Sequence, residues 1–232
     1  MLHIWMGRAR TGKSERVLKK LAELGDSSQQ ILLVPEHASH VAEMDVCRAC
    51  GDAASRHAEV LTFKLLATRV LGICGGSAEV TLDSGGKLLT LQRALTELAP
   101  ALKVYRRASQ RAAFLESLLA VMEELQAYAV EPETLAEKVE DLEGESGDKL
   151  RDIALLYGVY LARLHAPGRD AREALQKLEE NVEVSEYIDN KDVFLDGFSY
   201  FTGRELRILR ILLRRSKSVT VTLLGDTDDR EL

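Results

Sequence analysis

The sequence contains few aromatic residues and few prolines. Phe, Trp and Tyr together make up 5% of its 232 residues, which argues against a surface built mainly from base-stacking aromatic side chains. Only 4 prolines occur, while hydrophobic and charged residues account for 46% and 29%; this composition excludes a disordered tail, a collagen-like chain and a coiled-coil rod. A chain of this length can bury a large core without disulfides or a structural metal. We therefore expect one large globular domain, or one domain with an insertion.

Cysteines and long apolar segments are also scarce. The three cysteines (Cys47, Cys50 and Cys74) cannot all pair with one another. No secretion signal precedes the first apolar run, and no run approaches the ~20 residues needed to span a membrane. These absences predict a cytoplasmic protein with reduced thiols and no membrane partner.

An excess of negative charge is confined to one segment. The formal net charge is −6, and residues 131–150 carry eight acidic side chains beside only Lys138 and Lys149. The rest of the chain is therefore neutral overall. The acidic balance excludes a global basic field but not a local DNA-binding surface, and the acidic segment itself is interpreted as a solvated helix and loop.

Short apolar runs and helical periodicities alternate at both ends of the chain. The runs predict strands at Leu2–Met6, Ile31–Val34, Glu59–Phe63, Val193–Leu195 and Ser218–Leu224. Helices are predicted between them at Lys13–Leu24, His37–Ala49, Lys64–Leu71 and Gly203–Arg215. Alternation of this kind is typical of an α/β fold with a parallel sheet and crossover helices.

The middle of the chain has only helical periodicity. Helices are predicted at Gly85–Leu98, Arg111–Ala127, Thr134–Leu142 and Asp148–Leu164. We therefore expect an α/β domain formed by residues 1–80 and 186–232, interrupted by an all-helical sub-domain at 81–185.

The strongest motif follows the first predicted strand. Residues 7–14 match G-x-x-x-x-G-K-[ST] at every fixed position, and they open the first predicted helix. In such a P-loop, backbone N–H groups and the helix N-terminus face phosphate oxygens, Gly12 permits close approach, Lys13 neutralises phosphate charge and the Ser14 hydroxyl binds Mg²⁺. The predicted ATP-binding residues are Gly7, Arg8, Ala9, Arg10, Thr11, Gly12, Lys13 and Ser14. The alternative is a fortuitous glycine turn.

A magnesium site at a P-loop needs a carboxylate at the end of a nearby strand. Asp196 directly follows the apolar run Val193–Leu195 and is the candidate, together with Ser14. The alternative interpretation of Asp196 is an aspartate in a strand-end turn.

Two weaker patterns leave alternatives open. His37, His40, Cys47 and Cys50 have zinc-like spacing, but a helix would spread them over ~15 Å, so they are interpreted as surface histidines and small core cysteines. Lys103, Arg106, Arg107 and Arg111 form a basic stretch, and Arg207, Arg210 and Arg214 share one helix face. Each basic group is either a solvated face or, for residues 103–111 above all, a set of DNA phosphate contacts.

Several stretches together resemble the N-terminal part of the B subunit of the AddAB-type ATP-dependent helicase–nuclease, a bacterial machine for double-strand-break repair. They are GRARTGKS (7–14), ILLVPEHASHVAE (31–43), EVLTFKLLATRVL (59–71), GDKLRDIALLYGVYLARL (147–164) and VFLDGFSYFTGRELRIL (193–209). The resemblance implies a RecA-like, superfamily 1 helicase fold with an inserted helical sub-domain. It also implies Mg²⁺-ATP and DNA as ligands and a heterodimer with a motor/nuclease A-type subunit. The family's nuclease domain and iron–sulfur cluster lie beyond residue 232, so no metal cluster is expected in this fragment.

The sequence departs from active helicases of this type at two positions. They carry Asp-Glu where this chain has Asp196-Gly197, and a γ-phosphate-sensing Gln where this chain has Asp229. The second helicase lobe, which supplies arginine fingers, is not in these residues. We therefore expect a degenerate helicase module that binds nucleotide and turns it over slowly or not at all.

Two other functions remain open from the sequence alone. One is a free-standing P-loop ATPase or small-molecule kinase, although the roughly 180 mostly helical residues between Ser14 and Asp196 are unlike a compact kinase. The other is an interaction scaffold with a vestigial P-loop.

Overall fold

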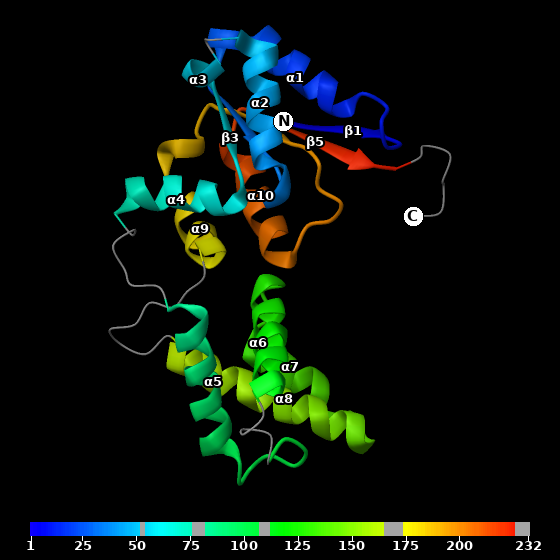
Figure 1. Cartoon of the computed structure of the whole chain (residues 1–232), viewed down its shortest axis with the longest axis vertical. Helices are drawn as coiled ribbons and strands as arrows, with labels where there is room; N and C mark the ends of the chain where they lie inside the picture. Colours follow the sequence, from blue (N-terminus) through cyan, green and yellow to red (C-terminus); the bar gives the residue numbers. More distant parts are fainter. Residues whose placement is uncertain (52–53, 76–81, 107–111, 165–173, 226–232) are drawn as a thin grey trace. The chain divides into compact units, whose positions relative to one another are not determined.

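The computed structural model describes all residues except 52–53, 76–81, 107–111, 165–173 and 226–232 (Figure 1). Contacts divide the chain into two compact units. The sheet unit contains Met1–Ser77 and Ala174–Leu232, and the helical unit contains Ala78–Glu173. The sequence pattern predicts these boundaries at 80/81 and 185/186, so the two divisions differ mainly over residues 174–185.

The sheet unit is built on a five-stranded sheet with the order β1-β5-β4-β2-β3, and all its strand pairs are parallel. Its strands are β1 (Leu2–Gly7), β2 (Gln30–Leu33), β3 (Ala58–Leu61), β4 (Asp192–Leu195) and β5 (Ser218–Leu224). Every residue of β2 and β4 is buried, as expected for inner strands covered on both faces. The α/β class with a parallel sheet is therefore confirmed, and the arrangement is consistent with a RecA-like fold.

Helices cover both faces of this sheet (Figure 1). They are α1 (Lys13–Leu24), α2 (Ser39–Cys50), α3 (Ala54–His57), α4 (Phe63–Cys74), α9 (Ala174–Val182) and α10 (Gly203–Arg215). Side chains alternate along β2: Ile31 and Leu33 pack with α4, α9 and α10, while Leu32 packs with α1 and α2. Each face of the sheet thus has its own hydrophobic core.

Helix caps explain where the element boundaries differ from those predicted. The third strand ends at Leu61 rather than Phe63, because the Thr62 hydroxyl accepts a hydrogen bond from the Leu65 N–H at 3.2 Å and starts α4. Helix α7 (Pro132–Glu140) begins two residues earlier than predicted, since Pro132 suits the first helical position.

Helix α9 was not predicted as a helix of its own. Its Leu178 and Val182 are fully buried in the core of the sheet unit, against α4 and α10. Ion pairs join α9 and the turn after it to α10: Glu179 lies 3.5 Å from Arg207, and Glu183, just beyond α9, lies 3.1 Å from Arg214. These glutamates partly neutralise the arginine face of α10, which favours its interpretation as a structural face rather than a DNA surface.

The helical unit contains α5 (Ser84–Leu98), α6 (Ala112–Ala127), α7 and α8 (Gly144–Leu164). Leu91, Leu95, Met122, Leu156 and Tyr160 are fully buried in its core. None of the helices within the described ranges has the length and apolar character needed to cross a membrane.

One buried carboxylate ties two segments of the helical unit together. Asp152 of α8 is 4% exposed and accepts hydrogen bonds from the backbone N–H groups of Lys103, Val104 and Tyr105, at 2.8 to 3.0 Å. These bonds fix the backbone of residues 103–105, where the basic stretch begins.

Candidate nucleotide-binding site

The loop between β1 and α1 depends on its two glycines. Gly12 lies just before α1 with φ of 81°, a left-handed conformation that disfavours other residues. A Cβ atom at Gly7 would lie 2.8 Å from Thr11 Oγ1, which itself donates to the Arg8 carbonyl at 2.8 Å. The backbone conformation therefore favours glycine at position 12, whereas a side chain at position 7 would displace the Thr11 hydroxyl.

The N-terminus of α1 has backbone N–H groups that are suited to binding an anion. The helix begins at Lys13, and no side chain caps it. Its first N–H groups consequently lack a side-chain acceptor, and together with the helix dipole they suit a phosphate group.

The Lys13 side chain forms hydrogen bonds with the backbone of the loop. Its ammonium donates to the carbonyl oxygens of Gly7 at 2.7 Å and Arg8 at 2.6 Å. The side chain therefore runs along the inside of the loop, where a bound phosphate would meet its charge.

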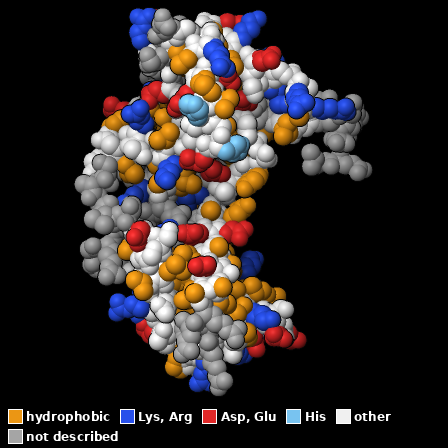
Figure 2. All heavy atoms as spheres, in the orientation of Figure 1, with side chains coloured by type: hydrophobic (Ala, Val, Ile, Leu, Met, Phe, Trp, Pro, Cys, Tyr) orange, Lys and Arg blue, Asp and Glu red, His pale blue; other side chains and the backbone are white. Residues whose placement is uncertain are grey.

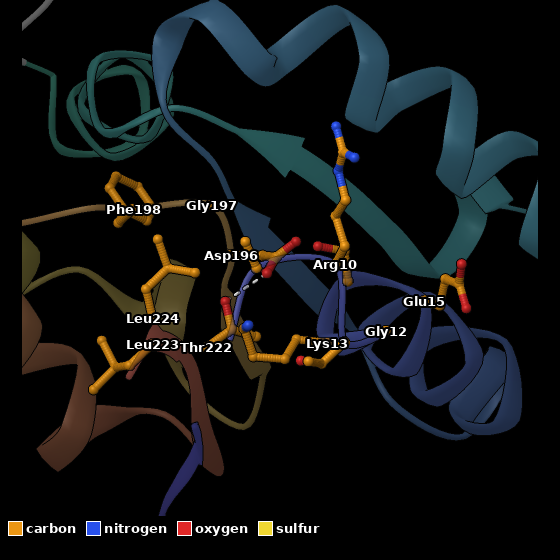
Figure 3. Close-up of a pocket in the computed structure, with 13 residues that line it drawn as sticks. Arg10, Gly12, Lys13, Glu15, Asp196, Gly197, Phe198, Thr222, Leu223 and Leu224 are labelled. Carbon is orange, nitrogen blue, oxygen red and sulfur yellow. Dashed lines mark hydrogen bonds between the residues drawn. The ribbon is translucent and has the colours of Figure 1, made fainter. Parts of the chain in front are cut away.

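A pocket of about 420 Å³ opens beside this loop (Figure 3). Its lining combines the loop and the first residues of α1 with the ends of β4 and β5. The lining residues are Ala9, Arg10, Thr11, Gly12, Lys13, Ser14, Glu15, Asp196, Gly197, Phe198, Thr222, Leu223 and Leu224. The fold thus brings the predicted Lys13, Ser14 and Asp196 to one pocket, at the carboxyl edge of a parallel sheet where such folds bind ligands.

Thr222 is a site residue that the sequence analysis missed. Its hydroxyl donates to Asp196 Oδ1 at 2.5 Å, because β5 lies between β1 and β4 (Figure 3). The bond fixes one carboxylate oxygen of Asp196. Thr222 is one of three hydroxyl residues in β5, with Ser218 and Thr220, so the sequence does not single it out, and its partner depends on strand order.

The residues present fit a magnesium ion only as part of a nucleotide complex. Within the described ranges, no group of three or more His, Cys, Asp or Glu side chains could hold a metal. Ser14 and Asp196 line one pocket and would supply two oxygen ligands, and Mg²⁺ commonly completes its shell with phosphate oxygens and water.

The residue after Asp196 adopts a conformation suited to glycine. Gly197 has φ of 80°, and a Cβ there would lie 3.6 Å from Pro35 Cδ. A glutamate at this position would therefore be strained, although its Cβ would not clash.

The whole chain was compared with models of known protein families. The family model described as "ADDB, N-terminal" matches residues 4–232. The chain belongs to this family. The resemblance inferred from the motifs is thereby confirmed.

Relatives in the family are named as the B subunit of an ATP-dependent helicase/deoxyribonuclease. The relative from Thermoanaerobacter sp. (strain X514) is 34% identical over 225 residues, which are 95% of this chain and 20% of the relative. Those from Clostridioides difficile (strain 630) and Clostridium perfringens (strain 13 / Type A) are both 31% identical, over 97% of this chain and 20% of each relative. The chain thus spans about a fifth of the length of these relatives.

The candidate DNA contacts are only partly described. Lys103 Nζ lies 2.8 Å from Asp148 Oδ1, and hydrogen bonds from Lys103 and Arg151 hold the pKa of Asp148 below its usual value. Arg106 is exposed, whereas Arg107 and Arg111 lie outside the described residues, as does Asp229. Figure 2 shows acidic and basic side chains interspersed over the visible face rather than gathered into one basic surface.

The histidine and cysteine pattern lies along α2 and the turn before it. His37 and His40 are exposed, as expected, but the expectation of core cysteines is wrong for Cys47, which is exposed, and Cys50 is only partly buried. Cys50 packs at the edge of the core that contains Val46, whereas Cys47, the next residue after Val46, lies on the exposed side of α2.

Proposed function

We propose that this chain is the nucleotide-binding N-terminal module of a helicase–nuclease subunit acting in DNA double-strand-break repair and recombination. The sheet unit is the P-loop helicase-like domain, and the helical unit is its inserted sub-domain. The observation that carries the proposal is the pocket that Lys13, Ser14 and Asp196 line together. Family membership and the relatives' names support the wider context.

In the proposed complex, Lys13 and the N–H groups of residues 12–14 hold the phosphates of ATP. Ser14 and Asp196 hold Mg²⁺, and Thr222 keeps the Asp196 carboxylate oriented. ATP would supply the phosphoanhydride whose cleavage drives an active helicase. This module would bind it with little turnover, because Gly197 offers no carboxylate to orient water.

The wider proposal places this module in a cytoplasmic complex with DNA and a motor/nuclease A-type subunit. The helical unit would contribute DNA phosphate contacts through Lys103, Arg106, Arg107 and Arg111. Removing these four charges should lower the salt slope of log K for DNA by about 0.7–0.9 per contact. An unchanged salt slope would favour the alternative interpretation, in which residues 103–111 form a solvated face.

Nucleotide binding is tested by titrating a fluorescent ATP analogue with and without Mg²⁺. Lys13→Ala should weaken binding by about 3 kcal/mol, or roughly 100-fold, because the phosphates lose a charged donor. Lys19→Ala removes an exposed lysine from the same helix, outside the pocket, and should leave affinity unchanged. Equal affinities for the wild type and Lys13→Ala would refute the proposal.

A structural role for the loop is the second candidate. The Lys13 ammonium already donates to two loop carbonyls, so the loop holds its shape without phosphate. A scaffold with a vestigial P-loop would show no Mg²⁺-dependent nucleotide binding in the same titration. A free-standing ATPase would instead release phosphate in steady state faster than roughly 1 s⁻¹, within the usual range for enzymes.

A further inference from the structure

A second hollow lies entirely within the helical unit, between α7 and α8 (Figure 1 shows the two helices). Its volume is about 610 Å³. Its lining includes small residues from both helices: Ala136 on α7, and Ala154 and Gly158 on α8. Leu155 also lines this groove, with 41% of its surface exposed. The groove therefore presents apolar surface to solvent.

One wall of the groove is acidic. Glu133, Glu137 and Glu140 of α7 line it, and their spacing of four and three residues puts them on one side of the helix. Among the described residues, none of these three carboxylates takes part in an ion pair. Like charges at such spacing repel one another, so an incoming cation would relieve that repulsion.

The basic residue in the lining does not neutralise this wall. Arg151 donates to three backbone carbonyls at the end of α7, those of Val139, Glu140 and Leu142. It also forms an ion pair with Asp148 at 2.6 Å. Its guanidinium therefore caps α7 and pairs with a carboxylate outside the groove.

We propose that this groove docks a basic amphipathic helix of the companion subunit, an inference that rests on the proposed function. Apolar residues of that helix would cover Leu155 and Ala136, and its Lys or Arg residues would face Glu137 and Glu140. The nine residues of α7 span about 13 Å, which accommodates two turns of such a helix. Nucleic acid and anionic lipid are unsuitable occupants, because the acidic wall repels phosphate.

The unpaired charge favours a separate chain over a segment of the same subunit. Complementary charge accelerates the encounter of two chains that must find each other by diffusion. A segment tethered within one chain already has a high effective concentration and gains less from such steering.

Site-specific cross-linking in the full-length subunit, assembled with its companion, tests the occupant. A photoreactive residue at Leu155 should cross-link to a companion peptide that contains apolar and basic residues. The matched position is Leu150, which lies on the same helix with 39% of its surface exposed but does not line the groove. It should not give that product. Cross-links from Leu155 only to the same subunit, only to DNA, or to nothing in an intact assembly would overturn the proposal.

Charge-reversal variants test whether the acidic wall of the groove accelerates association with the companion subunit. Glu137→Lys/Glu140→Lys should slow association of the two subunits at least five-fold at low salt and flatten its salt dependence. Glu116→Lys/Glu124→Lys makes the same charge change at exposed sites on α6, outside the groove, and should have a much smaller effect. Equal rates for the two variants would overturn the proposal.

Mg²⁺-nucleotide binding measured on the same samples separates the two proposals. Normal nucleotide binding and assembly without the Leu155 cross-link would refute the groove alone. If the subunits never assemble, both the docking proposal and the proposed heterodimer are refuted. Nucleotide binding at the P-loop is tested separately, by the nucleotide titration.

Discussion

The two units of this chain place their candidate functions on different kinds of structure. In the sheet unit, the site depends on backbone conformation: a left-handed Gly12, the uncapped start of α1 and the ends of parallel strands. In the helical unit, the candidate surfaces depend on side-chain charge, with Asp148 beside Lys103 and glutamates along α7. The comparison indicates that the first site is sensitive to geometry and the second to electrostatics.

The largest effect is expected in the helical unit. Asp152→Ala leaves three backbone N–H groups without their carboxylate and should destabilise this unit by about 3 kcal/mol. Trp5, the single tryptophan, lies in the sheet unit, so the unfolding transition seen by its fluorescence should keep its midpoint. The part of the helical circular-dichroism signal that comes from the helical unit should be lost at a lower temperature. Asp148→Ala removes only partly exposed ion pairs and should have a much smaller effect on stability. A parallel shift of the Trp5 transition would show that the units do not unfold independently.

Backbone dependence of the nucleotide site is tested at Gly12. Gly12→Ala forces a Cβ into the left-handed region and should cost about 1–2 kcal/mol in stability, together with a loss of nucleotide affinity. Gly75 has nearly the same conformation, with φ of 82° and ψ of 14°, and lies outside the pocket. Gly75→Ala should therefore lower stability similarly without changing affinity, as measured by denaturation and titration. Equal affinity losses would contradict a specific role for the loop.

A smaller effect is expected from the newly identified partner of Asp196. Thr222→Val keeps the side-chain shape but removes the hydroxyl donor, and should cost about 1 kcal/mol in the free energy of unfolding. Because Asp196 is then less well oriented, Mg²⁺ should also enhance nucleotide binding less strongly. Thr220→Val, two residues earlier on the same buried strand and outside the pocket, is the control. Similar Mg²⁺ dependence in both variants would argue against the bond.

The smallest effect concerns acid stability of the sheet unit. Burial acts to raise the pKa of Asp192, but the hydrogen bonds that its carboxylate accepts from Ser218 and Lys217 outweigh it and lower that pKa. The stabilisation is therefore full above the unfolded value of about 3.9 and is lost as pH falls through the folded pKa. Asp192→Asn should cost about 0.5–1 kcal/mol at pH 7 and less at pH 3. Urea titrations at the two pH values, monitored by Trp5 fluorescence, measure how much unfolding free energy the substitution removes. A larger loss at pH 3 than at pH 7 would contradict the lowered pKa of Asp192.

Contiguous residues allowed the sequence to predict much of the sheet unit. The P-loop at residues 7–14, its strand and its helix are local features, since each depends on side chains and glycines within one or two turns of chain. The buried runs at β2 and β4 were likewise visible as apolar segments ending at Pro35 and Asp196. Boundaries were less predictable where a single cap such as Thr62 decided them.

Features that depend on two distant segments were decided by tertiary structure alone. Thr222 meets Asp196 because β5 lies between β1 and β4, and no local pattern encodes that strand order. Likewise α9 joins the sheet unit through Leu178 and Val182, and glutamates on this helix and in the turn after it pair with arginines of α10. The acidic stretch shows the same limit: periodicity predicts a helix, but only the packing of α7 on α8 turns its glutamates into the wall of a groove. Sequence determines which side chains share one face of an element, whereas the partner of that face follows from how the elements pack.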